Sequence, residues 1–343
     1  MSINYKTSGV DIDNANAAKK QMAGSLNSTN PRVLNKHMAF ASLYDIKFPE
    51  YKNPVLVLKT EEPGSKQLLA LQYDRVEGIC FDMINHLIND CIVMGARPLT
   101  IQDAIICGQL EKDKVVRMVK AIAEAAQAQG CDLTGGETSE QPGVIPEGTY
   151  ILTSSIVGIA ERAQIIDGRK ISEGDVVLTL ESSGPHTNGY TLIRKLIKDN
   201  PEIVKEKIDS RTFIELVLEP HRCYYQNLKN LFSTGQITGL AHITGGGIKE
   251  NLNRILPQNL SAEIDLSTYQ ILPIFKFIKN QTQMTDEEML RTFNLSVGLA
   301  MVVKPDAADK IMEQIKNQGV NCYAIGVITP GDQTVKTINT LNW

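Results

Sequence analysis

Hydrophobic residues in the first half of the chain occur in short runs separated by glycine, proline and charged residues, a pattern typical of β-strands. The runs that predict strands lie at 55–60, 67–73, 101–107 and 150–160. Residues 112–129 repeat apolar positions with helical spacing and end at Gly130. Because glycine readily adopts positive φ, it closes a helix there.

The second half mixes strand-like and helix-like periods in the same way. Strands are predicted at 175–181, 238–244, 261–265, 295–303 and 321–328, and helices at 189–199, 211–232, 247–256 and 305–318. The alternation favours a mixed α/β (α+β) fold, with helices packed on mixed sheets. We expect a polar N-terminal arm at 1–45, one domain at 46–170 and a second at 171–343.

Length and charge agree with two globular domains. The chain has 343 residues, 42% of them hydrophobic, and 35 basic against 39 acidic residues give a net charge of −4. A mildly acidic chain argues against a nucleic-acid or anionic-membrane surface. No run of apolar residues is long enough to span a bilayer, and the N-terminus has no apolar signal core. The six cysteines are scattered without a C-x-x-C pair, so we expect free thiols in a cytoplasmic protein.

The segment 82–90 places its short polar side chains on one helical stripe, because each helical residue advances by about 100°. The stripe consists of Asp82, Asn85, His86, Asn89 and Asp90. A solvated helix face is the simpler explanation, but such faces usually carry Lys, Arg and Glu. Carboxylates with amides and no basic residue favour a bound divalent cation such as Mg²⁺.

Further acids and a lysine extend this hypothesis in the first half. Glu61 ends the first strand, and a strand from Leu133 runs into a glycine turn at Gly135-Gly136, followed by Glu137. Glycine allows a ligand to approach the backbone closely, although a plain polar loop is the alternative. Lys66 is a candidate phosphate contact, although a single lysine is more often simply solvated.

Two glycine-rich turns in the second half, 181–190 and 241–251, each follow a strand and precede a helix. The unpaired N–H groups of a helix start bind anions, and Ser183 and Thr244 would add hydroxyl donors; two ordinary tight turns are the alternative. Neither turn is a Walker loop or a dinucleotide fingerprint, and no G-x-S-x-G motif is present. Acids in one domain and anion sites in the other favour phosphoryl transfer from a nucleotide to a phosphate-bearing acceptor.

An ordered set of motifs resembles the phosphoribosylformylglycinamidine cyclo-ligase (AIR synthase) family. The resemblance runs from residue 5 to about residue 330. Its motifs are Tyr5-Lys6-x-x-Gly9-Val10-Asp11-Ile12-Asp13, Asn89-Asp90, Gly95-Ala96-x-Pro98, Gly135-Gly136-Glu137-Thr138, Ile165-Ile166-Asp167-Gly168, Ser183-Gly184-Pro185-His186-x-Asn188-Gly189-Tyr190, His242-x-Thr244-Gly245-Gly246-Gly247 and Arg291-Thr292-Phe293-Asn294.

This resemblance implies an enzyme that uses ATP and Mg²⁺ to close formylglycinamidine ribonucleotide into aminoimidazole ribonucleotide, a step of purine synthesis. It also implies a homodimer in which N-terminal sheets pair into a barrel. The N-terminal domain would then serve ATP binding and dimerisation. The C-terminal domain would be the AIR-synthase-like one.

The candidate site comprises predicted catalytic residues, ATP contacts, metal ligands and substrate contacts. Asp90 and His186 are the predicted catalytic residues. Predicted ATP contacts are Lys66, Asp82, Asn89, Asp90, Gly136 and Glu137, and predicted metal ligands are Glu61, Asp82, Asp90 and Glu137. Predicted contacts to the phosphoribosyl substrate are Ser183, Gly184, His186, Asn188, Thr244, Gly245, Gly246 and Gly247.

Two loops depart from the family pattern. The family's T-D-G-V-G-T-K reads T-E-E-P-G-S-K at 60–66, and its G-G-F-G-A-L reads M-A-F-A-S-L at 38–43. The first change leaves open another enzyme of the superfamily, such as a thiamine-monophosphate kinase. The second leaves open a catalytically silent nucleotide-binding regulator. The acids kept at Asp90 and Glu137 favour the cyclo-ligase.

Overall fold

The computed structural model describes residues 12–26, 29–35 and 40–343. The predicted motif at 5–13 and the loop at 38–43 fall partly outside these residues. Two compact units are present. Unit 1 comprises residues up to Cys91 together with Arg97–Glu161, and unit 2 comprises Ile92–Ala96 and Arg162–Trp343.

Unit 1 is built on a four-stranded sheet with the order β1-β4-β2-β3. Its strands are β1 Pro54–Glu61, β2 Arg97–Cys107, β3 Asp132–Glu140 and β4 Tyr150–Glu161. Strand β4 pairs antiparallel with both β1 and β2, whereas β3 runs parallel to β2. The predicted strands at 55–60, 101–107 and 150–160 are confirmed.

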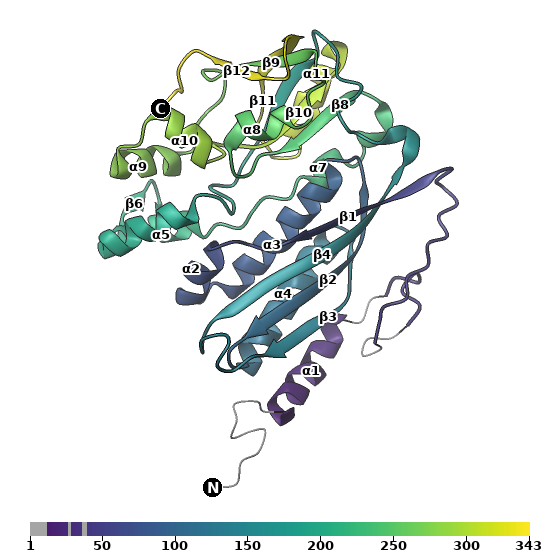
Figure 1. Cartoon of the computed structure of the whole chain (residues 1–343), viewed down its shortest axis with the longest axis vertical. Helices are drawn as coiled ribbons and strands as arrows, with labels where there is room; N and C mark the ends of the chain where they lie inside the picture. Colours follow the sequence, from purple (N-terminus) through teal and green to yellow (C-terminus); the bar gives the residue numbers. More distant parts are fainter. Residues whose placement is uncertain (1–11, 27–28, 36–39) are drawn as a thin grey trace. The chain divides into compact units, whose positions relative to one another are not determined.

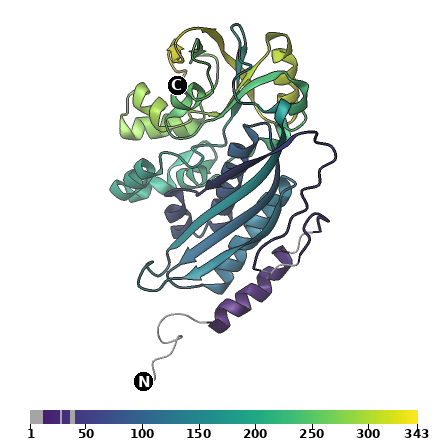
Figure 2. The same ribbon diagram turned by 45° about the vertical axis from the view of Figure 1, so that its right-hand side comes forward.

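Helices of unit 1 cover one face of this sheet (Figures 1 and 2). Those on this face are α2 Lys66–Gln72, α3 Val76–Ile92 and α4 Lys112–Ala128, and α1 Ile12–Leu26 lies at the β3 edge. Helix α4 confirms the helix predicted at 112–129. Helix α1, which lies within the predicted arm, packs against α4 and β3.

The other face of this sheet carries exposed apolar side chains. Leu56 and Leu58 alternate with less exposed residues along β1, and Leu58 pairs with Val157 of β4. Since side chains two residues apart share a face, Ile151 belongs to the same surface as Val157. Leu56, Leu58 and Ile151 are 56%, 70% and 37% exposed. We call Leu56, Leu58, Ile151 and Val157 the open sheet face.

Two predictions in unit 1 are wrong. Residues 67–73 form helix α2, because the buried Lys66, Leu69 and Ala70 follow the i, i+3, i+4 spacing of a helix rather than the alternation of a strand. The expected glycine turn at 135–136 is instead the middle of β3, whose Gly136 pairs with Asp103 of β2.

Unit 2 contains a six-stranded sheet with the order β12-β9-β11-β5-β10-β8, antiparallel except for β12 beside β9. The strands are β5 Val176–Glu181, β8 Ile237–His242, β9 Leu260–Asp265, β10 Val297–Val303, β11 Cys322–Pro330 and β12 Val335–Ile338. All five strands predicted in this half are confirmed, and every residue of β10 is buried. A short β6 Lys207–Ile208 and β7 Arg211–Thr212 pair separately.

The helices of unit 2 are α5 Tyr190–Asp199, α6 Phe213–Val217, α7 Tyr225–Leu228, α8 Gly247–Asn253, α9 Pro273–Thr282, α10 Asp286–Thr292 and α11 Ala308–Asn317. Helices α5, α8 and α11 confirm three predicted helices. The single helix predicted at 211–232 is wrong. Helix α6 stops at Val217, and Pro220, which lacks an N–H and restricts the residue before it, prevents its continuation.

All six cysteines are free thiols, five of them buried, which confirms the predicted free thiols. Among the described residues, no helix combines the length and apolar character needed to cross a membrane.

Candidate functional site

The end of β1 and the last turns of α3 bring together two of the predicted metal ligands. Lys59 lies between them, with Nζ 3.0 Å from a carboxylate oxygen of Glu61 and 3.0 Å from one of Asp90. Nε2 of His86 is 3.6 Å from Glu61 and 3.7 Å from Asp90. The two acids therefore converge on one cation-binding position within unit 1.

The electrostatics of Lys59 show how strongly this position favours positive charge. Burial by itself lowers the pKa of Lys59, but hydrogen bonds to Glu61 and Asp90 outweigh burial, so the pKa lies above its usual value. The ammonium group of Lys59 thus shows that this position accommodates a positive charge. The donor set of two carboxylates fits Mg²⁺, which prefers oxygen ligands.

Asp82 lies on the same helix but has a different environment. Its carboxylate oxygens are both 2.8 Å from Nζ of Lys66. Both residues are fully buried. The solvated alternative for Lys66 is therefore wrong, and the stripe at 82–90 is not a solvated face. The predicted metal role of Asp82 stays a prediction, because Lys66 already neutralises its charge.

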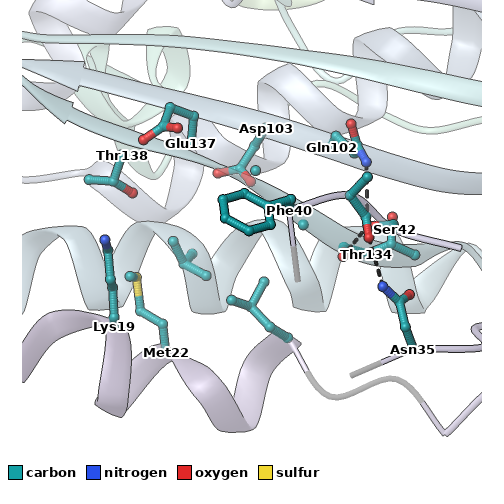
Figure 3. A pocket seen from close by; sticks show the side chains of 15 residues that line it. Lys19, Met22, Asn35, Phe40, Ser42, Gln102, Asp103, Thr134, Glu137 and Thr138 are labelled. Carbon is teal, nitrogen blue, oxygen red and sulfur yellow. Dashed lines mark hydrogen bonds between the residues drawn. The ribbon is translucent and has the colours of Figure 1, made fainter. Parts of the chain in front are cut away.

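A cavity of about 510 Å³ lies in unit 1 beside β3. Its walls are Lys19, Met22, Leu26, Asn35, Phe40, Ala41, Ser42, Gln102, Asp103, Val119, Thr134, Gly135, Gly136, Glu137 and Thr138. Figure 3 shows Lys19 reaching from α1 towards Glu137 and Thr138, with Phe40 pointing into the space. Glu137 thus lines this cavity, whereas Glu61, Asp82 and Asp90 are not among its walls.

Sequence reasoning missed Asp103, a buried carboxyl group in the wall of this cavity. Burial raises the pKa of Asp103 to about 7. A Cβ atom on Gly136 would lie 2.0 Å from Oδ1 of Asp103. Gly136 therefore makes room for Asp103, and its backbone contact with ATP stays a prediction. The signal was present in the sequence, because an acid inside an apolar strand at 101–107 is unusual.

The two predicted anion-binding turns lie next to each other in unit 2. A Cβ atom on Gly245 would be 3.6 Å from Oδ1 of Asn188. Nδ2 of Asn188 is buried and has no hydrogen-bond partner among the described residues. Such a donor is costly unless a ligand or water accepts from it, which makes Asn188 the best-supported of the predicted substrate contacts.

Other members of the turns are engaged in holding the backbone. Oγ of Ser183 donates to the carbonyl of Pro220 at 2.7 Å, and Oγ1 of Thr244 is 3.2 Å from Oδ1 of Asn251. Asn251 also donates through Nδ2 to the carbonyls of Gly245 and Gly247 at 3.1 and 2.8 Å. Their roles as substrate contacts stay predictions.

The remaining turn glycines are explained by backbone geometry. Gly184 has φ +146°, and its carbonyl accepts from Nδ2 of Asn294 at 2.9 Å. Gly246 precedes α8 with φ +88°, which favours glycine. A Cβ on Gly247 would lie 1.8 Å from the carbonyl oxygen of Leu290, so glycine is required for close contact with α10.

His186 is fully buried and has a positive φ of 59°. The N–H of Ser183 donates to its Nε2 at 3.2 Å, so a neutral His186 carries its proton on Nδ1. The ring stacks on His221 with centroids 3.7 Å apart. The structure thus fixes which ring nitrogen of His186 can donate.

Comparisons with known proteins agree with this architecture. Residues 43–160 match the family model "AIR synthase related protein, N-terminal domain", and residues 172–338 match "AIR synthase related protein, C-terminal domain". Among solved structures, thiamine-monophosphate kinase from Stenotrophomonas maltophilia has a TM-score of 0.66 at 16% identity, covering 95% of both chains. Hydrogenase maturation protein HypE in complex with ATP has a TM-score of 0.67 at 15% identity, covering 96% of this chain and 92% of that one. At these identities the likeness shows the fold alone.

Sequence relatives are much closer. The phosphoribosylformylglycinamidine cyclo-ligase of Neisseria meningitidis is 38% identical over 329 residues, or 95% of each chain. That of Methylobacillus flagellatus is 38% identical over 328 residues, covering 95% of this chain and 94% of its own. With both domain models matched in order and this identity over almost the full length, the chain belongs to the phosphoribosylformylglycinamidine cyclo-ligase family.

Proposed function

We propose that this protein is an ATP-dependent cyclo-ligase of purine biosynthesis, which closes formylglycinamidine ribonucleotide to aminoimidazole ribonucleotide. The observation that carries the proposal is the 38% identity to cyclo-ligases over 95% of both chains. The thiamine-monophosphate kinase and HypE structures, at 15–16% identity, share only the fold.

The chemistry has two steps. The formyl oxygen attacks the γ-phosphorus of ATP and ADP leaves, which converts that oxygen into a good leaving group. An amidine nitrogen then attacks the former formyl carbon and phosphate departs. The amidine nitrogen and the former formamide nitrogen each lose a proton, one of which the phosphate takes up. A proton then moves from the ring methylene to the exocyclic imine nitrogen, which gives the aminoimidazole. Such a reaction depends on positioning and charge neutralisation more than on a strong nucleophile.

Unit 1 would supply the groups for ATP. Glu61 and Asp90 already hold a cation, and in our proposal they bind Mg²⁺ once Lys59 turns towards the phosphates. Mg²⁺ would neutralise charge on the triphosphate. Asn89, Lys66 and Asp82 from the same region, and Gly136 and Glu137 at the cavity beside β3, complete the proposed ATP contacts.

Unit 2 would hold the phosphoribosyl substrate. Nδ2 of Asn188 needs an acceptor, which a phosphate or carbonyl oxygen of the substrate would provide. Nδ1–H of His186 would donate to the developing oxyanion or the leaving phosphate. Peptide N–H groups of the neighbouring turn, with Thr244 and Gly245-Gly246-Gly247, and of Ser183-Gly184 would contribute further donors.

The direct test supplies purified protein with ATP, Mg²⁺ and formylglycinamidine ribonucleotide. We expect aminoimidazole ribonucleotide and ADP in equal amounts. ADP formation at background rate with this substrate, but above background with thiamine monophosphate, would favour the kinase alternative. Tight ATP binding in calorimetry without turnover on any phosphoribosyl substrate would favour a regulator.

Asp90→Asn tests the site in unit 1. Removing one charge from a metal–phosphate cluster should lower kcat by roughly 30- to 1,000-fold, or about 2–4 kcal/mol of transition-state stabilisation. The matched control is Asp113→Asn, because Asp113 is a surface carboxylate with a 91% exposed side chain. An unchanged kcat in Asp90→Asn would remove this residue from the mechanism.

The open sheet face supports a homodimer. Contiguous exposed apolar side chains on a monomer are unfavourable, and a second copy of the same sheet is the partner that the family resemblance implies. We propose that two such faces pair into a barrel. We also propose that the enzyme works in the cytoplasm, where purine intermediates and ATP are available.

A further inference from the structure

Three histidines from separate segments of unit 2 form a buried cluster. His186 lies in the turn between β5 and α5, His221 lies between α6 and α7, and His242 is the last residue of β8. Their exposed fractions are 0%, 1% and 6%. One ring nitrogen of each lies within 4.8 Å of those of the other two. The proposed cyclo-ligase reaction requires no such arrangement of three imidazoles.

A hydrogen bond within the cluster joins His221 and His242. Their Nε2 atoms are 2.9 Å apart, a distance at which one nitrogen donates a hydrogen bond and the other accepts it. The ring of His186 stacks over that of His221 with an interplanar angle of 19°. The three rings cannot all be imidazolium cations at the same time at these distances, because buried like charges repel strongly.

We propose that this cluster binds one divalent transition-metal ion of the Zn²⁺ type through ring nitrogens of His221, His242 and His186. Imidazole is the nitrogen ligand that Zn²⁺, Co²⁺ and Ni²⁺ favour, whereas Mg²⁺ takes oxygen ligands. The cluster and the acids near Lys59 should therefore select different ions. This inference does not rest on the proposed function.

The geometry requires only local adjustment. Zn–N bonds of 2.0–2.1 Å in a tetrahedral site separate two ligand nitrogens by about 3.4 Å, so the Nε2 atoms of His221 and His242 must move apart by about 0.5 Å. His186 must tilt out of its stack and exchange the 3.2 Å bond from Ser183 for the metal. His221 and His242 are thus the principal ligands, and His186 is the third.

Proton balance determines how binding depends on pH. In the neutral pair, one ring carries its proton on Nε2, and that proton moves to Nδ1 of the same ring when Nε2 binds the ion. Each ring that is charged beforehand releases one proton to solvent. Because protons compete with the ion for the ring nitrogens, metal affinity should decrease in acid.

The experiment uses the full chain after treatment with a chelator. Equilibrium dialysis against Zn²⁺ followed by metal analysis should find one tightly bound ion per chain. Co²⁺ should produce visible d–d absorption with an intensity typical of tetrahedral nitrogen coordination. Absence of both signals in the wild-type protein would overturn the proposal, whatever happens to any variant.

Two variants locate the ion. His221→Gln keeps a hydrogen-bonding group near the position of Nε2 but removes the imidazole, and it should weaken Zn²⁺ binding by more than the roughly 10- to 100-fold typical of losing an outer-shell partner. His37→Gln removes a histidine that the proposal does not use and should leave binding unchanged. Equal Zn²⁺ affinity in His221→Gln and wild type would place the ion elsewhere and refute the site.

Discussion

At the residue scale, the protein contains both buried and exposed ion pairs. Lys66 and Asp82 form a fully enclosed ion pair, with no exposed surface on either residue. Lys195 and Asp199 form a surface pair whose side chains are 70% and 57% exposed. Because solvent screens only the second pair, the two should respond very differently to the loss of the lysine.

Lys66→Ala should therefore destabilise the protein by about 3–5 kcal/mol, because it leaves the carboxylate of Asp82 buried without a counter-charge. Lys195→Ala is the control and should cost less than about 1 kcal/mol. Urea unfolding followed by circular dichroism measures both changes. Similar losses in the two variants would contradict this account of the buried pair.

Asp103 makes stability depend on pH in the opposite direction from most acids. Its pKa rises from 3.8 to about 7 on folding. Between these values the unfolded chain loses a proton that the folded chain keeps, so this residue's contribution to stability decreases as the pH rises from about 4 to about 7 and is constant above that.

Asp103→Asn preserves the shape of the protonated carboxyl and removes this effect. We expect the variant to be more stable than wild type at pH 8, on the order of 2–4 kcal/mol, with a much smaller difference at pH 4. Urea unfolding at the two pH values provides the comparison. A difference between variant and wild type that does not change with pH would show that folding leaves the pKa of Asp103 unchanged.

At the scale of single elements, the periodicity of hydrophobic residues identified most strands and several helices. It failed where tertiary contacts decided whether a segment forms a helix or a strand. Segment 67–73 contains alternating-looking apolar residues, yet it is a helix because Lys66 and Leu69 are both buried on one helical face. The glycines at 135–136 suggested a turn, yet β3 continues through them, paired with β2. Neither partner strand nor ion pair is visible in local sequence.

Strand β3 provides a matched pair of substitutions. Gly136→Ala would place Cβ 2.0 Å from Oδ1 and 2.5 Å from the backbone oxygen of Asp103, so the strands must separate. Gly135→Ala meets only Oγ of Ser42 at 3.2 Å, and that side chain can rotate. We expect Gly136→Ala to cost about 1–3 kcal/mol and Gly135→Ala to cost clearly less, measured by urea unfolding. Equal losses of unfolding free energy in the two variants would indicate that Asp103 moves away from the added Cβ at little cost.

At the scale of the whole molecule, unit 1 presents a sheet with helices on one face and exposed leucines on the other. Residue patterns predicted both the strand β1 and its charged end, and the family resemblance implied its use in a homodimer. The interface itself stays a prediction, and it concerns the open sheet face.

Leu58→Glu tests this interface, because two glutamates brought together in an apolar contact are strongly unfavourable. We expect a dimer for the wild type and a monomer for Leu58→Glu in light scattering coupled to gel filtration. Val327→Glu is the control, since Val327 is an exposed strand residue in the sheet of unit 2. A wild-type monomer, or an unchanged dimer in Leu58→Glu, would reject the proposed interface.

The sequence by itself determined the family, the mixed α/β class and the positions of most strands, because these depend on local period and on an ordered set of motifs. It also predicted Glu61 and Asp90 as metal ligands. The structure places Glu61 at the end of β1 and Asp90 near the end of α3. Tertiary structure decided the rest. It paired Lys66 with Asp82, placed Asp103 beneath Gly136, and gathered three histidines that are 35 and 21 residues apart in sequence. Burial and long-range contacts set the charge state of such groups, and no local pattern encodes them.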